Sequence, residues 1–315
     1  MPKVSVIIPV YGVEKYIERC ARSLFEQTLD DIEYLFIDDC TPDKSIDVLK
    51  RVLEDYQQRK SQVTIHRMEK NSGQAAVRNW GMQHVTGEYY IHCDSDDWVE
   101  TDMYQLLYEQ AKCNNADISI CDFVEGNEED NKIFKGCKST DKFQLISDLC
   151  SMQTSWSACN KLVKTSLLHH YDIVYPNGNM GEDMAVVLQL MLYVEKIAYV
   201  PKPLYHYYIN PRSITHNKSE NNKWKNYRQL LGNVGIVLSA FTKCEIANKY
   251  HSELEFVKWN VRLQIWNLAY IPQYRKVWKD TFPELFPSFL MNPYINFEIR
   301  VKFFLTYLAL YPRKK

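Results

Sequence analysis

The sequence predicts an α/β fold with a doubly wound, mostly parallel sheet of the Rossmann-like type, followed by a mainly helical C-terminal extension. Apolar runs rich in Val and Ile alternate with helical patterns from residue 4 to residue 121. These runs are continuous, which is typical of strands that are buried on both faces of a parallel sheet. From about residue 217 the chain is glycine-poor and its apolar patterns are helical.

Five strands and four helices are predicted in the first half of the chain. We expect strands over residues 4–10, 32–38, 63–66, 89–93 and 117–121. The spacing of apolar residues predicts helices over residues 17–25, 45–60, 74–85 and 103–114. In an open parallel sheet, ligands bind beyond the carboxyl ends of the strands, so the residues that follow the strands form one candidate site.

Composition and charge restrict the classes of function. The 315 residues are 46% hydrophobic and 24% charged, as in globular proteins, and the formal net charge is -1. No global field therefore attracts nucleic acid, and nucleic acid is not expected as a partner. Nine cysteines without a CxxC pair fit neither a disulfide framework nor a zinc site, which predicts a reducing compartment, the cytoplasm.

The apolar pattern also bears on membrane insertion. The opening MPKVSVIIPV turns polar again within a few residues, which predicts a strand rather than a signal peptide. No apolar run approaches the ~20 residues that are needed to span a bilayer. We expect a chain that is in solution or at most attached to a membrane surface.

Three carboxylates, Asp94, Asp96 and Asp97, crowd the segment DSDD after the fourth predicted strand, with Ser95 between them. Like charges this close repel one another, and a hard divalent cation is the usual compensation. Mg²⁺ or Mn²⁺ takes oxygen ligands and keeps waters and substrate phosphates in its shell, so we interpret the segment as a metal–diphosphate site. The alternative is a solvated acidic turn, which the position at a strand end disfavours.

The residues after the other strands predict a nucleotide pocket. Asp38 and Asp39 follow the second strand, and a carboxylate there can accept the N3–H of uracil. Tyr11 could stack on the base, while Lys70 and Arg78 would bring positive charge to the phosphates. The alternatives are a turn cap for the acids, a surface ion pair for Arg78, and GDP or dTDP, which also offer an imide N–H, in place of UDP.

Four motifs in order carry a resemblance to a known family. VSVIIPVYGVEKYIERCARSLFEQT, IEYLFIDDCTPDKS, NSGQAAVRNWGM and GEYYIHCDSDDWV resemble the family-two inverting glycosyltransferases of the GT-A fold, especially bacterial enzymes of capsule, O-antigen and exopolysaccharide assembly. The resemblance covers roughly residues 3–215. It implies a nucleotide-sugar donor whose base lies near Pro9, Tyr11 and Asp39, and a metal that bridges the diphosphate to the DxD-type acids.

Within these acids the resemblance places Asp94 nearer the ribose and either Asp96 or Asp97 nearer the metal. Ser95 belongs to the same donor-binding set. The chain departs from the family pattern at Cys40, where a glycine is commoner.

A catalytic base is expected at the start of a helix, in the segment GED. Inverting transfer needs a base to take the proton of the attacking hydroxyl, and the resemblance places an acid of this segment in that role. Adjacent helical residues point about 100° apart, so Glu182 and Asp183 are not both expected to face the substrate, and we expect Asp183 to be the base. The alternative is that both acids only complement the helix dipole.

Further candidates lie on the acceptor or donor-sugar side and over the diphosphate. Trp156, Asn160 and Lys161 are candidates for the wall of the sugar site, with a place in the core as the alternative for the tryptophan. In YHYYINPRSIT the resemblance implies a segment that can lie over the diphosphate, with Arg212 and His216 as candidate phosphate contacts.

Together these features predict a metal-dependent hexosyl- or N-acetylhexosaminyl-type glycosyltransferase that uses a UDP-sugar and a saccharide or lipid-linked acceptor in cell-surface polysaccharide synthesis. We expect a GT-A catalytic domain over residues 1–216, with its nucleotide-binding part to about 123 and its acceptor part from about 124, and a helical region over 217–315. The alternative is an inactive module that scaffolds a polysaccharide assembly complex. A nicotinamide-dependent oxidoreductase is disfavoured because no GxGxxG follows the first strand.

The last stretch, NFEIRVKFFLTYLALYPRKK, places aromatic and apolar side chains close to one helical face and ends in basic residues. The face comprises Phe303, Phe304, Tyr307, Leu308 and Tyr311. We expect this helix to pack on the rest of the protein; the alternative is contact with the inner face of the cytoplasmic membrane.

Overall fold

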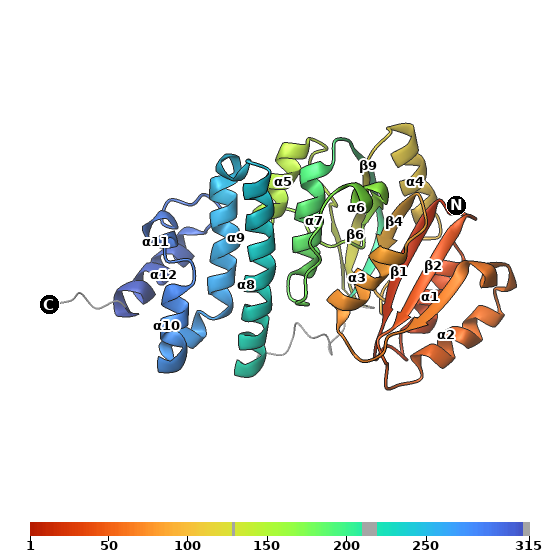
Figure 1. Ribbon diagram of the computed structural model, residues 1–315, viewed down its shortest axis with the longest axis horizontal. Helices are drawn as coiled ribbons and strands as arrows, with labels where there is room; N and C mark the ends of the chain where they lie inside the picture. Colours follow the sequence, from red (N-terminus) through yellow and green to blue (C-terminus); the bar gives the residue numbers. More distant parts are fainter. Residues whose placement is uncertain (128–129, 210–218, 311–315) are drawn as a thin grey trace.

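The computed structural model describes residues 1–127, 130–209 and 219–310 of the chain. One half of the molecule is a sheet with helices on both of its faces, and the other half is built of helices alone, beginning with α8 (Glu220–Lys243) (Figure 1). The predicted class, an α/β doubly wound sheet with a helical C-terminal extension, is confirmed.

The elements of the first half lie within a few residues of their predicted places. They are β1 (Val4–Val10), α1 (Ile17–Phe25), β2 (Ile32–Asp38), α2 (Ser45–Glu54), η1 (Gln57–Gln62), β3 (Val63–Arg67), α3 (Gln74–His84), β4 (Tyr89–His92), α4 (Met103–Cys113) and β6 (Ile118–Gly126). One predicted helix was too long. It ends at Glu54 because the amides of Asp55 and Tyr56 bond three residues back, which tightens the last turn, and the 3₁₀ helix η1 follows.

The half that contains the sheet has further strands and helices. They are β5 (Trp98–Val99), β7 (Asn131–Phe134), α5 (Lys142–Cys150), β8 (Lys161–Lys164), α6 (Ser166–His170), α7 (Glu182–Tyr193) and β9 (Ile197–Tyr208), of which β5, β7 and β8 are short strands that the sequence did not predict. Strands of two to four residues carry too little periodicity to be recognised. The predicted helix start at Glu182 is confirmed, after a left-handed Gly181 with φ of 76°.

The strand order of the sheet places a crevice beside the first strand. The nine strands that the described residues form run in the order β3-β2-β1-β4-β8-β6-β9-β5, with β7 paired to β6. β1 is parallel both to β2 on one side and to β4 on the other. The winding direction therefore changes between β1 and β4, and the crevice beyond their carboxyl ends is the topological switch point where such sheets bind ligands.

Two apolar cores cover the two faces of the sheet. Alternate residues of β1 point to opposite sides, so Ile7 packs in one core and Ile8 in the other, and both are fully buried. The core that contains Ile8 includes α1, α2 and α4, whereas the core that contains Ile7 includes α3, α5 and α7. Gly81 lets α3 lie close on β1, since a Cβ added there would stand 2.5 Å from Cγ2 of Ile7.

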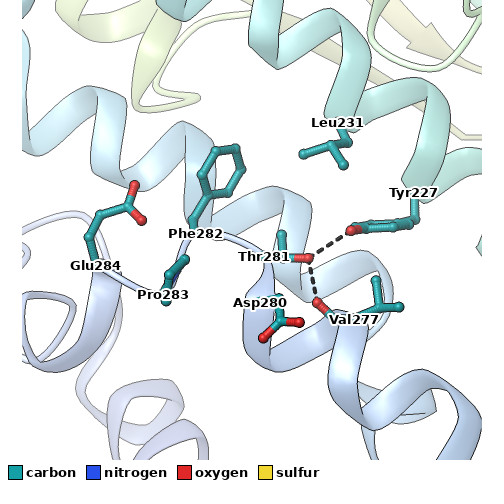
Figure 2. Close-up of a pocket in the computed structure, with 8 residues that line it drawn as sticks. All are labelled: Tyr227, Leu231, Val277, Asp280, Thr281, Phe282, Pro283 and Glu284. Atoms are coloured by element: carbon teal, nitrogen blue, oxygen red, sulfur yellow. Dashed lines mark hydrogen bonds between the residues drawn. The ribbon is translucent and has the colours of Figure 1, made fainter.

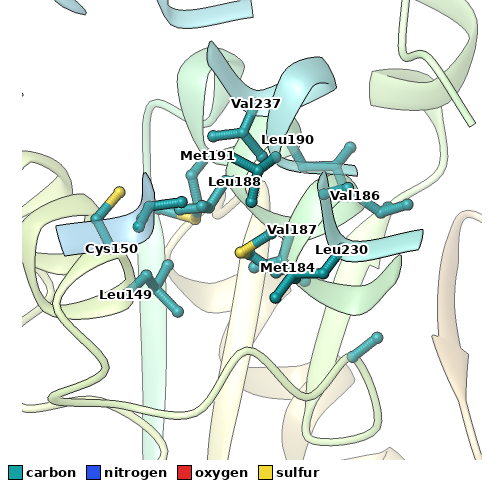
Figure 3. Packing of buried hydrophobic residues seen from close by; sticks show 14 of the residues in the cluster. Leu149, Cys150, Met184, Val186, Val187, Leu188, Leu190, Met191, Leu230 and Val237 are labelled. Carbon is teal, nitrogen blue, oxygen red and sulfur yellow. The ribbon is translucent and has the colours of Figure 1, made fainter. Parts of the chain in front are cut away.

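The core that contains Ile7 continues without a break into the C-terminal helices. Residues 184 to 192 of α7 are all buried, and α7 lies between the sheet and α8 (Figure 1). Figure 3 shows side chains of α7, α5 and α8 in contact at this junction. The helices beyond α8 are η3 (Ala247–Tyr250), α9 (His251–Gln264), η4 (Asn267–Tyr270), α10 (Pro272–Asp280), α11 (Leu285–Ser288) and α12 (Phe297–Leu310).

The face of α12 that was expected to pack does so in part. Phe303 is fully buried, and the ring of Tyr307 stacks on Phe286 with 3.6 Å between centroids, whereas Leu308 is half-exposed. Tyr311 lies outside the described residues. Within the described ranges, no helix combines the length and apolar character needed to cross a bilayer. Contact with a membrane surface stays a prediction.

Candidate active site

The carboxyl ends of β1 and β4 are joined by a side chain of the acidic turn, which we define as residues Asp94–Asp97. The Ser95 hydroxyl donates a hydrogen bond of 2.6 Å to the carbonyl oxygen of Pro9. Ser95 is only 4% exposed. The Ser95 hydroxyl therefore joins two strand ends, and the place of Ser95 in the donor-binding set stays a prediction.

The centre of the site is Arg78 on α3, the helix that lies close on β1. Its guanidinium donates from Nη2 to Asp94 at 2.7 Å, and from Nη1 to the carboxylates of Glu182 and Asp183. The side chain is 2% exposed. We call these four residues the Arg78 cluster. The buried guanidinium thus pairs with three acids, and the expected contact of Arg78 with donor phosphates stays a prediction.

The two acids of α7 differ in their access to solvent. The Glu182 side chain is 7% exposed, whereas that of Asp183 is 29% exposed. Burial raises the pKa of Glu182 to about 8, although Arg78 opposes the shift. Burial also raises the pKa of Asp183, again against Arg78. Of the two carboxylates, the one that can be reached from the crevice is that of Asp183.

Two acids of the acidic turn are partly exposed and the third is buried. Asp94 and Asp96 are partly exposed, whereas Asp97 is 0% exposed. The Asp97 carboxylate accepts a hydrogen bond from the hydroxyl of Tyr205 and another, of 2.8 Å, from the amide of Tyr208. Burial raises its pKa well above the ordinary range, and the nearby acids add to the shift. Asp97 is therefore an internal anchor of the turn, and its role as a metal ligand stays a prediction.

Strand β9 and helix α1 supply residues that the sequence did not assign to the site. The Tyr205 hydroxyl, besides its bond to Asp97, accepts the amide N–H of Asp94 at 3.2 Å. Arg19 donates to the carbonyl of Asp96 at 3.0 Å and lies over the ring of Trp98 at 3.7 Å. Residues about 80 to 110 positions apart make these contacts, so no local spacing could have revealed them.

At the end of β2, where the sequence predicts the nucleotide pocket, a carboxylate orders the loop before α3. The two oxygens of Asp39 accept the amides of Ser72 and Gly73 at 2.7 and 2.8 Å. Cys40, where a glycine is commoner in the family, has φ of 57°, so the turn keeps the left-handed geometry that favours glycine. Asp38 is buried and accepts from the amide of residue 41 and from Arg67, which fits the turn-cap alternative.

Two other nucleotide candidates are open to solvent. Tyr11 is 50% exposed just beyond β1, and Lys70 is exposed on the loop that leads to α3. Both positions are compatible with contact to a bound ligand, and their roles stay predictions.

The candidates for the sugar side are placed in the interior. Lys161 is 1% exposed, and its Nζ donates to the carbonyls of Ser155 and Ser157 and to the side chain of Asn160, at 2.8 to 2.9 Å. Asn160 is likewise 1% exposed. The Trp156 ring nitrogen donates to the carbonyl of residue 149 at 2.6 Å. The polar heads of Asn160 and Lys161 thus bond within the chain, and Trp156 packs against the core. That these three residues wall the sugar site stays a prediction. Arg212 and His216 lie outside the described residues.

The segment that leads into the candidate base is held from two sides. We define the base loop as residues 177–181. Asn233 of α8 donates from Nδ2 to the carbonyls of Gly178 and Met180 at 2.8 and 2.9 Å. On the other side, the Asn179 side chain accepts an amide of the first turn of α3 at 3.1 Å. The base loop is thus clamped between α3 of the catalytic half and α8 of the helical region.

A cavity in the helical region is separate from this site. The hydroxyls of Tyr227 and Thr281 are 2.7 Å apart there, and Thr281 also donates to the carbonyl of Val277 (Figure 2). None of its lining residues was a candidate from the sequence: Tyr227, Leu231, Val277, Asp280, Thr281, Phe282, Pro283 and Glu284.

Comparison with known proteins shows what this chain is similar to. The model of the family described as glycosyl transferase family 2 matches residues 5–166. Glycosyltransferase GlyA of Streptococcus pneumoniae is 30% identical over 237 residues, which are 70% of this chain and 32% of GlyA, so the chain spans about a third of that relative. The putative glycosyltransferase EpsH of Bacillus subtilis is 28% identical over 298 residues, 92% of this chain and 76% of EpsH.

A solved structure shares the fold. The crystal structure of S. aureus TarS residues 1–349 in complex with UDP-GlcNAc superposes with a TM-score of 0.71 and 20% identity, over 92% of this chain and 82% of TarS 1–349. The agreement extends over the sheet and the helical region.

Replacing Arg78 is expected to destabilise the protein strongly. Arg78→Ala would leave three partly buried carboxylates without their shared cation, at a cost of roughly 3–5 kcal/mol in the free energy of unfolding. The matched control is Arg22→Ala, whose guanidinium is 39% exposed and also pairs with two acids. That change should cost less than about 1 kcal/mol. Urea denaturation measures both, and equal losses in the two variants would contradict the cluster's role.

The pKa of Glu182 predicts a pH-dependent difference in stability. The folded protein holds the Glu182 proton up to about pH 8, whereas the unfolded chain releases it near its ordinary pKa of 4.5. The stability of the protein relative to Glu182→Gln should therefore fall as pH rises through this window, by at most ~1.4 kcal/mol per pH unit. Denaturation of both proteins across the window tests this. A difference that stays flat or rises with pH would refute the raised pKa.

Proposed function

This chain belongs to glycosyl transferase family 2, and on that premise we propose that it transfers a sugar from a UDP-sugar to a hydroxyl of a saccharide or lipid-linked acceptor, with inversion at the anomeric carbon, in bacterial cell-surface polysaccharide synthesis. The observation that carries the proposal is the Arg78 cluster. One guanidinium there brings a carboxylate of the acidic turn together with the two carboxylates at the start of α7. Groups suited to the leaving diphosphate and to the attacking hydroxyl thus lie within a few ångströms.

The donor would lie across the switch point between β1 and β4. Each oxygen of Asp39 accepts one amide, and a carboxylate has about four acceptor positions in all, so Asp39 can still accept the N3–H of uracil. Tyr11 is exposed beside it for stacking, and Lys70 for contact with a phosphate. The presence of UDP-GlcNAc in the TarS complex supports a UDP-sugar with an N-acetylhexosaminyl or hexosyl group.

A divalent cation fits the acidic turn, with fewer protein ligands than the sequence predicted. In the ranges that the structure describes, no three His, Cys, Asp or Glu side chains converge to form a metal site. Mg²⁺ sites at substrate phosphates commonly use only one or two carboxylates, and Asp94 and Asp96 are the partly exposed acids. When bound to them and to the diphosphate, Mg²⁺ or Mn²⁺ would neutralise charge that develops on the leaving group.

Asp183 would act as the general base. As the acceptor oxygen bonds to the anomeric carbon and the bond to the diphosphate breaks, the acceptor proton passes to the Asp183 carboxylate. A raised pKa makes that carboxylate a stronger base than an ordinary aspartate, which suits proton transfer near neutral pH. Glu182, more deeply buried and with a pKa of about 8, would remain protonated beside it.

UDP should bind in a metal-dependent manner. We expect calorimetry to show binding with Mn²⁺ or Mg²⁺ and a much weaker affinity with a chelator, because the cation links the diphosphate to acids that would otherwise repel it. Asp96→Asn should weaken this metal-dependent binding. Asp47→Asn, at an exposed position of α2, is the control with the same change in charge. Equal UDP affinity with and without metal would count against the site.

Asp183→Asn should separate chemistry from donor binding. The variant keeps the shape and loses the basicity, so transfer should fall by the ~10² to 10⁴ that is typical of a lost general base. UDP affinity should change little, and Asp172→Asn, an exposed acid paired with Lys243, should leave both measurements unchanged. Near-normal turnover of Asp183→Asn with loss in Glu182→Gln would move the base to Glu182. If the wild-type chain neither binds UDP nor hydrolyses a UDP-sugar, the inactive scaffold is the better explanation.

A further inference from the structure

A groove runs along α8 beside the base loop. Its lining comes from the base loop and from one face of the helix, with side chains three to four residues apart: Asn177, Gly178, Lys225, Arg228, Gln229, Gly232, Asn233 and Ile236. We call it the α8 groove. Asn233 and Gln229 tie its two walls together, because both bond to the backbone of the base loop.

The α8 groove is electropositive. Lys225 and Arg228 are exposed, and no ion pair of either is present among the residues that the structure describes. Of the residues that the structure describes, none with an acidic side chain lines the groove. Two neighbouring cations that pair with no acid of the described ranges, in a concave site with amide side chains, suit an anion that accepts several hydrogen bonds, such as a phosphate group.

The surrounding region has the same sign of charge. Residues 219–315 contain 15 Lys and Arg against 7 Asp and Glu, whereas residues 1–218 contain 23 against 32. The net charge of -1 therefore conceals a basic helical region joined to an acidic catalytic half. Such an asymmetry favours a large anionic partner at the helical region.

The position of the groove identifies which substrate it serves. Gly178 precedes Asp183 by five residues, and the base loop between them is held rigidly by Asn233 and by α3. The donor side of the crevice, with Asp39 and Tyr11, is formed instead by the ends of β1 and β2. A ligand in the groove thus approaches the reaction from the base side, which is the side of the acceptor.

We propose that the α8 groove binds a phosphate group of the acceptor through Lys225 and Arg228, and so directs the acceptor hydroxyl toward Asp183. This inference rests on the proposed glycosyltransferase function. The phosphate belongs either to a phosphate-containing saccharide in solution or to the head of a lipid-linked one, and the chemistry of recognition is the same for both.

Two glycines of α8 provide a steric test. Gly232 lines the groove and Gly235 does not, and at both positions a Cβ would meet no atom within 4 Å. Leucine has a higher helix propensity than glycine, so neither Gly232→Leu nor Gly235→Leu should prevent folding. Only Gly232→Leu fills the groove, without any change in charge.

The charge test pairs two exposed cations of the helical region. Arg228→Glu replaces a cation of the groove with an acid. Lys276→Glu makes the same change in net charge on α10, at a residue that does not line the groove. With the full chain saturated by UDP and Mn²⁺, binding of inorganic polyphosphate is measured by calorimetry and binding to phosphatidylglycerol vesicles by sedimentation. Arg228→Glu and Gly232→Leu should each weaken binding by about 10-fold or more, as expected for a lost charged hydrogen bond, while the controls stay within about 2-fold of wild type.

The outcomes separate the sources and the two proposals. Groove-dependent binding of polyphosphate indicates a phosphate-containing acceptor in solution, and groove-dependent binding of vesicles alone indicates a lipid phosphate. The inference is overturned if the wild type binds neither probe, or if the groove variants bind as the controls do. UDP affinity, measured in all four variants, should be unchanged. Its absence in the wild type would defeat the proposed function, whereas intact UDP binding without groove binding defeats only this inference.

Discussion

The candidate site depends on one buried cation. The guanidinium of Arg78 pairs with three acids from two segments, and so joins α3 to the acidic turn and to the start of α7. Removing a charge from water costs several kcal/mol unless partners compensate it, so the fold is stable only when all these segments meet. The same pairing keeps the carboxyl groups of Asp94, Glu182 and Asp183 together at one end of the crevice. The raised pKa values of Glu182 and Asp183 show that burial outweighs even this cation.

The helical region also holds the candidate site in place. α8 packs on α7 in the core that contains Ile7, and Asn233 donates two hydrogen bonds to the base loop that precedes Glu182. Asn179 ties that loop to α3. Met180, which accepts one of these bonds, precedes Asp183 by three residues. A displacement of α8 would therefore also move the backbone that carries Asp183. The 24 residues of α8 thus both cover the core that contains Ile7 and hold the base loop in place.

The acidic turn shows how neighbouring acids acquire different roles. Asp94 is oriented by Arg78, Asp96 is partly exposed, and Asp97 points into the core toward Tyr205 and Tyr208. Water is the better solvent for a carboxylate, so burying Asp97 is tolerated only because strand β9 supplies two donors. The buried acid in turn fixes the backbone that presents its neighbours to the crevice.

The sequence by itself determined the order of strands and helices from β1 to α4, the position of the acidic turn beyond a strand end, and the helix start at Glu182, because apolar periodicity and glycine turns are local signals. Tertiary structure alone decided which acid of the turn is buried, that Arg78 pairs with three acids, that the Asn160 amide bonds to Cys121, and that α8 holds the base loop. Those contacts join residues about 15 to 110 positions apart. The partner of a charged side chain is fixed by the topology that brings distant segments together, and a linear pattern does not record it.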